Sequence, residues 1–227
     1  MRGENLIRLV IAGVVLMLAG TAVLIFDIVA GTGPVVAEPF ATRADLDRIP
    51  ELTPEHVPYI TEAVRALVAE LGPTPLIGFS GAPFTLASYL VEGGPSKTHQ
   101  RTKALMHGDP ELWRDLCARL AQIARVFLQV QIDAGASAVQ LFDSWVGALP
   151  RTDYLRFVEP HSRAVFEGVS SSVPRIHFGV GTGELLGDMA AAGADVIGVD
   201  FRVSLTDAVQ RTGGRFPVQG NLDPALL

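Results

Sequence analysis

Cysteine and positive charge are both scarce in this sequence of 227 residues. The single cysteine, Cys117, excludes an internal disulfide and a cysteine-rich zinc site, and it suits a reducing compartment. The 18 Lys and Arg residues form no cluster and are outnumbered by 24 Asp and Glu, giving a net charge of −6. This balance argues against a nucleic-acid partner, because phosphate binding needs clustered basic residues. With 48% hydrophobic residues, we expect one packed core or a βα barrel somewhat short of full size.

Charge is also missing from Leu9–Phe26, a run of 18 residues that follows Arg2 and Arg8. The run contains no proline and mixes Leu, Met and Ala, so we expect a helix. Its length is close to the ~20 apolar residues that cross a bilayer, so one interpretation is a membrane anchor or an uncleaved signal. The other is an aberrant start joined to a barrel. We therefore divide the chain into an apolar segment, 1–26, and a globular part, 27–227.

Short apolar strands alternate with amphipathic helices in the globular part. Thr42 is expected to cap a first short helix that has Asp45 in its first turn. The clearest helix begins at Asp109 and Pro110, a cap followed by proline, and Gly135 closes it. Further helices are expected at 55–70, 184–192 and 204–211, with one broken near Pro160, and strands at 75–79, 139–142, 175–180, 196–201 and 216–220. This alternation predicts a parallel sheet with helices packed on it.

No strand is followed by the glycine pattern that binds dinucleotides. Gly179–Gly183 comes nearest, but its spacing differs from that pattern and no acidic partner lies at the expected distance. We therefore predict an α/β fold that is an incomplete (β/α)8 TIM barrel with an N-terminal apolar helix, rather than a Rossmann sheet.

In such a barrel the chemistry lies where the strands end. Aromatic rings, hydroxyls, glycines and carboxylates share five such segments: Phe79–Gly81, Phe142–Trp145, Gly179–Thr182, Asp200–Arg202 and Gly220–Asp223. The rings could bind a ligand or plug the barrel mouth. Asp200 and Asp223 could be general acids or helix caps. Phe79, Phe142 and Asn221 are predicted to lie on one rim.

Three ordered motifs resemble one enzyme family. Gly78–Gly94 reads GFSGAPFTLASYLVEGG, and it is followed by Gln140–Ser144 and Gln219–Pro224. Together they are similar to the uroporphyrinogen decarboxylases, and the resemblance covers about 27–227. It implies a cytoplasmic lyase of porphyrin and heme biosynthesis that is a homodimer, with uroporphyrinogen III as substrate. It also implies removal of the carboxyl groups of the four acetate arms, giving coproporphyrinogen III, without metal, cofactor or prosthetic group.

The resemblance also implies which residues bind the substrate. The motif tyrosine falls on Tyr89, and the phenylalanine ten residues before it falls on Phe79. The aromatic and hydroxyl pair of the second motif falls on Phe142 and Ser144. The residue types suit these roles, because phenyl rings can pack on a flat macrocycle and hydroxyls can donate to its carboxylates.

The charged groups that the family implies have no match in this sequence. These are an arginine segment and an aspartate near the N terminus and a histidine segment near the C terminus, and Asp27 does not align with that aspartate. We therefore assign no catalytic residue. We expect a truncated form with little activity, since each lost charge-assisted contact is worth ~1.5–3 kcal/mol.

Two other functions stay open. One is a membrane-tethered, non-catalytic barrel fragment, with membrane contact through Leu9–Phe26. The other is a corrinoid or thiol methyltransferase, which shares the barrel and binds zinc through His and Cys. The position of Cys117 on the apolar side of a helix, with no histidine nearby, argues against zinc.

Overall fold

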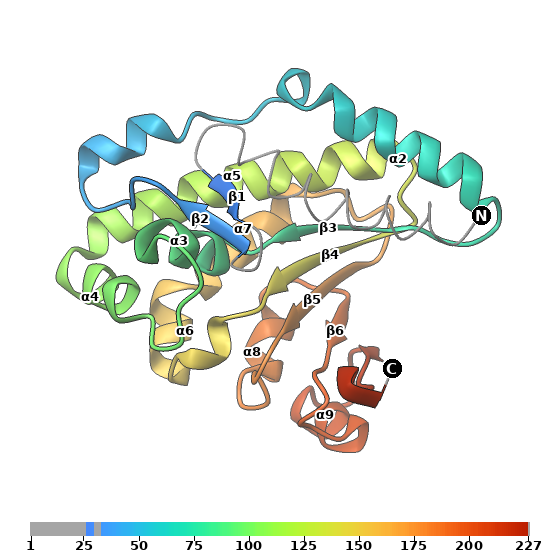
Figure 1. The fold of residues 1–227 in the computed structure, drawn as a ribbon. Coiled ribbons are helices and arrows are strands. Elements are labelled where there is room, and N and C mark those ends of the chain that lie inside the picture. The colour runs from blue at the N-terminus through green and yellow to red at the C-terminus, as the bar shows by residue number, and fades with distance from the viewer. Residues whose placement is uncertain (1–25, 30–32, 227) are drawn as a thin grey trace.

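The computed structural model describes residues 26–29 and 33–226. Its centre is a five-stranded sheet whose strands are all parallel and lie side by side in chain order (Figure 1). The strands are β3 (Ile77–Gly81), β4 (Ala138–Asp143), β5 (Arg175–Gly179), β6 (Val196–Gly198) and β7 (Val218–Gln219). The predicted α/β class with a parallel sheet is therefore confirmed.

Helices connect each strand to the next. They are α2 (Pro58–Leu71), α3 (Pro83–Glu92), α4 (Gln100–Gly108), α5 (Pro110–Asp133), α6 (Arg151–Phe157), α7 (Glu159–Gly168), α8 (Leu186–Ala191) and α9 (Leu205–Arg211). Short 3-10 helices lie at η1 (Arg43–Arg48), η2 (Pro54–His56), η3 (Val146–Ala148) and η4 (Pro224–Leu226). Every α-helix except α3 and α4 was predicted from the sequence, and so were the five strands of this sheet, to within a few residues of their ends.

Helix α5 is the longest packing element of the fold. The Leu112 N–H donates to Asp109 Oδ1 at 3.0 Å, and Pro110 is the first helical residue, as the sequence predicted. Its buried stripe includes Leu116, Leu120 and Phe127, and the helix packs on β3, β4, α3 and α7. Burying each such side chain stabilises the fold by roughly 1.5–3 kcal/mol.

The break expected near Pro160 lies between α6 and α7, at Val158. Pro160 is the second residue of α7, where its missing N–H is not needed. The chain therefore breaks before Glu159, two residues earlier than the proline suggested.

An antiparallel hairpin precedes the first helices. Strand β1 (Phe26–Val29) pairs with β2 (Gly33–Val36), with Phe26 opposite Val36. The helix predicted for Leu9–Phe26 lies outside the described residues up to residue 25, and at Phe26 it is wrong, because that residue begins a strand. Across 26–29 and 33–226, no helix has the length and apolar character to cross a membrane.

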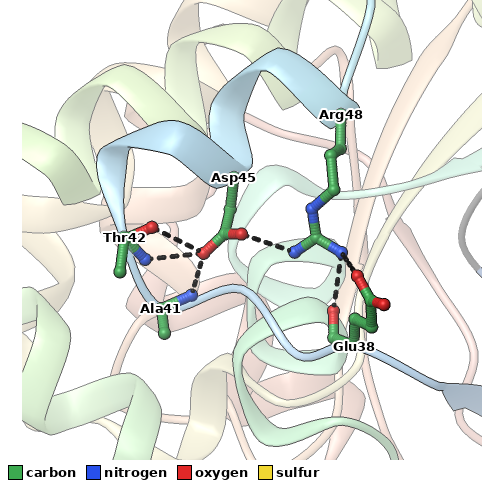
Figure 2. A network of polar contacts seen from close by, with 5 residues as sticks. All are labelled: Glu38, Ala41, Thr42, Asp45 and Arg48. Atoms are coloured by element: carbon green, nitrogen blue, oxygen red, sulfur yellow. Dashed lines mark hydrogen bonds and ion pairs between the residues drawn. The ribbon is translucent and has the colours of Figure 1, made fainter.

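The helix start predicted at Thr42 is the 3-10 helix η1, shown in Figure 2. Asp45 Oδ2 accepts hydrogen bonds from the N–H groups of Ala41 at 2.9 Å and Thr42 at 2.7 Å. Arg48 donates to Asp45 Oδ1 at 2.9 Å and forms an ion pair with Glu38 at 3.2 Å. The backbone donors are the main cause of the lowered pKa of Asp45. This network holds the chain between β2 and α2.

The two faces of the sheet differ in burial. On β4, Val139, Leu141 and Asp143 are buried on the face that packs on helices, whereas Gln140 and Phe142 on the opposite face are half-buried. Successive strand residues point to opposite faces, so this alternation separates a covered face from a partly open one. The candidate site was predicted at the carboxyl ends of the strands, and Phe142 of the open face lies one residue before the end of β4.

Candidate functional site

Three phenylalanine rings cover the open face of the sheet. Phe79, Phe142 and Phe178 come from the neighbouring strands β3, β4 and β5, and all are half-buried. The rings of Phe79 and Phe142 are 5.8 Å apart, those of Phe142 and Phe178 are 5.6 Å apart, and both pairs meet edge to face. This is a favourable aromatic geometry. The structure therefore brings the two predicted rings together and adds Phe178, which the sequence analysis did not single out.

Strand register explains how this row of rings forms. Gly81 lies opposite Phe142 and Gly198 lies opposite Phe178, so two of the three rings have a glycine beside them on a neighbouring strand. Phe142 and Phe178 lie opposite each other on adjacent strands. A signal for Phe178 was present in the sequence, because it is an aromatic residue near the end of a predicted strand, 175–180, as Phe142 is at the end of 139–142.

Tyr89 and Ser144 lie on two segments that follow the carboxyl ends of β3 and β4. Tyr89 lies on α3, which starts directly after β3, and Ser144 lies in the turn after β4. The ring of Trp145, the residue after Ser144, is 3.9 Å from the ring of Tyr89. Burial raises the pKa of Tyr89, so its hydroxyl stays protonated and able to donate at neutral pH. All four sequence-predicted site residues thus lie at the carboxyl end of the sheet.

A buried polar cluster around His99 packs against the Trp145 ring, which in turn contacts Tyr89. His99 adopts a left-handed backbone conformation, with φ of 52°, and its ring is 5.2 Å from that of Trp145. Its Nδ1 lies 2.7 Å from the hydroxyl of Ser88, which also contacts Thr102 at 3.1 Å. The Thr102 hydroxyl donates to Glu92 at 2.8 Å. This cluster fixes the connection between α3 and α4, and it was not predicted from the sequence.

Asp200 is neither a helix cap nor suited to be a general acid. It accepts from the Gly181 N–H at 2.6 Å and from the Arg202 guanidinium at 2.8 Å. Burial alone would raise its pKa, but these donors together lower it, so the carboxylate stays ionised. Helix α9 is capped by Ser204, whose hydroxyl accepts from the Asp207 N–H at 3.0 Å.

Asp223 behaves as the cap of a short helix. Its Oδ1 accepts from the Ala225 N–H at 2.9 Å and its carbonyl from the Leu226 N–H, next to η4. Asn221, two residues earlier, follows β7, so it lies at the same end of the sheet as Phe79 and Phe142, as predicted.

Cys117 does not have the environment of a metal ligand. It is fully buried, and burial raises the pKa of its thiol well above the usual value, so the thiolate that binds metal is disfavoured. In the part of the chain that the structure describes, no three His, Cys, Asp or Glu side chains are grouped to hold a metal ion.

Comparisons with known proteins agree on one family. The family model described as uroporphyrinogen decarboxylase (URO-D) matches residues 9–227. A uroporphyrinogen decarboxylase of Streptomyces griseus is 68% identical over 202 residues, which are 88% of this chain and 55% of that protein. One of Salinispora tropica is 65% identical, over 88% of this chain and 54% of the relative. The chain thus spans about 55% of the length of these curated relatives.

A solved structure shares the fold. A methyltransferase from Methanosarcina mazei superposes with a TM-score of 0.70 at 18% identity, covering 91% of this chain and 61% of that one. At this low identity the likeness concerns the fold alone.

Proposed function

The chain belongs to the uroporphyrinogen decarboxylase family, and from this we propose that it forms one wall of a site that decarboxylates uroporphyrinogen III. The five parallel strands in chain order support a further proposal, that they are part of a (β/α)8 TIM barrel whose interior is the open face of the sheet. The macrocycle would lie on this face.

The proposed reaction removes one carboxyl group at a time from the four acetate arms. Protonation of the adjacent pyrrole ring makes it an electron sink. The bond between the arm's CH₂ and its carboxyl group then breaks, CO₂ leaves, and the electron pair enters the ring. A proton added to the exposed carbon completes a methyl group, and loss of the ring proton restores the pyrrole. Four rounds give coproporphyrinogen III, with no metal or cofactor supplying electrons.

The observation that carries this proposal is the row of three phenylalanine rings on the open face. Phe79, Phe142 and Phe178 present an apolar surface suited to a flat macrocycle. Tyr89 and Ser144 stand at the carboxyl end of the same strands, where hydroxyl donors can meet the carboxylates of the substrate's arms.

The open face carries rings but no formal charge. In the described strands, its side chains are uncharged: Ile77, Phe79, Ala138, Gln140, Phe142, Ile176, Phe178, Val196 and Gln219. Acidic arms are bound strongly by charge-assisted hydrogen bonds, and neutral hydroxyls bind them less strongly. We therefore expect this chain alone to bind substrate weakly and to turn over below ~1 per second.

Anaerobic incubation of the purified chain with uroporphyrinogen III, followed by chromatography of the oxidised products, tests the reaction. Binding is measured separately, with uroporphyrin III as the probe. Tyr89→Phe should weaken binding about tenfold, because one hydrogen bond to a charged group is lost. Tyr59→Phe is the matched control, since Tyr59 is also half-buried on a helix but lies on α2. Equal affinity of Tyr89→Phe and wild type would contradict the role of Tyr89.

The partners of the chain are proposals as well. The family resemblance supports a cytoplasmic homodimer, and the apolar run Leu9–Phe26 supports membrane contact. Expression with and without residues 1–26, followed by fractionation and size-exclusion chromatography, separates the two. Movement from membrane to cytosol on deletion would identify an anchor and would support the division into 1–26 and 27–227.

A further inference from the structure

We propose that Asp143 is a positioning residue, which holds Ser144 and Tyr89 in a fixed relation through the hydroxyl of Thr85. The proposal rests on the proposed function, in which these two hydroxyls bind substrate. Asp143 itself is fully buried and points to the covered side of the sheet, so it cannot touch a ligand on the open face.

The Thr85 hydroxyl joins α3 to the end of β4. Its Oγ1 lies 3.0 Å from Asp143 Oδ1 and accepts from the Trp145 N–H at 3.4 Å. A hydroxyl has one proton to donate, which here goes to Asp143 Oδ1, and its lone pairs accept from the Trp145 N–H. Asp143 and Thr85 are both buried, where such a hydrogen bond is stronger than in water.

The residues before and after Ser144 are both held by Thr85. Its two chain neighbours, Asp143 and Trp145, both bond to Thr85. Thr85 and Tyr89 are four residues apart on α3 and therefore share one face of the helix. The ring of Trp145 then packs on the ring of Tyr89 at 3.9 Å. The turn after β4 is thus fixed to α3 at two successive helical turns.

The second oxygen of Asp143 is buried and, among the described residues, has no hydrogen-bond partner. Oδ2 lies 3.9 Å from Nε2 of His177, which is also fully buried, on the neighbouring strand β5. The other ring nitrogen of His177 is 3.4 Å from the carbonyl of Met189 on α8. The charge of Asp143 also reaches Tyr154, whose pKa is raised mainly by burial and then by this carboxylate. The hydrogen bond from Thr85 to Oδ1 is therefore the one hydrogen bond of the Asp143 side chain among the described residues.

Fluorine NMR of 5-fluorotryptophan-labelled protein tests the link without any ligand. The chain has two tryptophans, Trp113 and Trp145, and Trp145→Phe assigns the signals. Thr85→Val should shift or broaden the Trp145 signal only, and Thr85→Ser should restore it. Thr212→Val is the matched control, because its buried hydroxyl donates to the Ala208 carbonyl within α9. An unchanged Trp145 signal in Thr85→Val would overturn the proposal.

Uroporphyrin III binding provides the second measurement. Thr85→Val should raise the Kd about tenfold, while Thr212→Val and Thr85→Ser stay within about twofold of wild type. A general loss of stability would affect both valine variants alike, and equal Kd values for the two would overturn the proposal. If wild type does not bind at all, the proposed function fails, while the NMR result still decides whether Asp143 and Thr85 position the turn.

Asp143→Asn keeps the test decisive if Thr85→Val does not fold. The amide retains the shape of the carboxylate but exchanges one acceptor oxygen for a donor, so the bond to Thr85 weakens. The same displacement of the Trp145 signal is expected, and its absence would overturn the proposal.

Discussion

The ring of Phe178 lies directly over the backbone of Gly198 on the neighbouring strand. A Cβ added at Gly198 would come within 2.7 Å of the Phe178 Cβ and 2.8 Å of its Cδ2. Real Cβ atoms do not approach that closely, so either the ring or the backbone would have to move. Gly198 therefore sets the position of the third ring in the row that the proposed macrocycle would contact.

We predict that Gly198→Ala disturbs both stability and the site. Overpacking at this contact should cost about 1–3 kcal/mol of unfolding free energy, measured by urea denaturation. Because Phe178 packs edge to face on Phe142 at 5.6 Å, the affinity for uroporphyrin III should fall as well.

Gly108→Ala serves as the control for this substitution. Gly108 is the last residue of α4, and an added Cβ there would meet nothing within 4 Å. Alanine should therefore leave stability unchanged or raise it by up to about 1 kcal/mol. Equal effects of the two alanines would show that Phe178 is free to move.

Local pattern in the sequence was sufficient to predict most of the fold. Helix α5 was predicted because its signals are local, from the cap Asp109 to the apolar stripe that follows. Helix α3 was missed because nearly all of its residues are buried, so its sequence shows no amphipathic period. In α4 the two buried residues, Thr102 and Met106, are four positions apart. This helical spacing was a signal in the sequence that could have predicted α4.

The shared end of Phe79 and Phe142 in the sheet was predictable, but the contacts between distant residues were not. Phe79 and Phe142 were placed on one rim because strand ends in a parallel sheet meet at one edge. The bond between Thr85 and Asp143 joins residues 58 positions apart, and no local pattern indicates such a pair. His177 looked like an ordinary strand residue, but the register places it opposite Leu141, on the covered face that Asp143 shares, with Nε2 3.9 Å from Asp143 Oδ2.

Acid should destabilise the protein through His161 on α7. Burial, with a smaller contribution from the charge of Arg114, lowers the pKa of His161 from 6.5 to about 4. The unfolded chain therefore binds a proton before the folded one as pH falls. Stability that is present above about pH 6.5 should decline toward pH 4.

Urea titrations at pH 7 and pH 5 measure this decline. His161→Gln should reduce the difference between the two pH values, because the neutral side chain has no proton to bind. His56→Gln, at an exposed histidine, should leave the difference as in wild type. A decline of the same size in all three proteins would exclude His161 as its source.

The network of Figure 2 predicts that Asp45→Asn destabilises the N-terminal connection. The Asp45 carboxylate pairs with Arg48 and accepts hydrogen bonds from two backbone N–H groups. The amide of asparagine has no charge for these contacts, so we expect the free energy of unfolding to fall by about 1 kcal/mol. Because hydrogen bonds lower the pKa of Asp45 below 3.8, its contribution is present above that pH and is lost as pH falls further. Asp47→Asn, at an exposed position of the same turn, should have little effect on thermal unfolding.

We predict that the chain associates with itself through the edge strand β3. In the described sheet β3 is paired on one side only, with β4, and Ile77 at its start is 41% exposed. Ile77 also lines an apolar pocket with Val64 and Leu67 of α2. Unpaired strand edges with apolar neighbours favour pairing between chains, and a lysine at the edge opposes it. Ile77→Lys should therefore shift the protein toward monomer in sedimentation velocity at a fixed concentration.

Leu155→Lys is the matched control, because Leu155 is 38% exposed but lies on the helix α6 and not on a strand. Equal shifts in both variants would point to general charge repulsion, and a wild type that is already a monodisperse monomer would contradict association through β3.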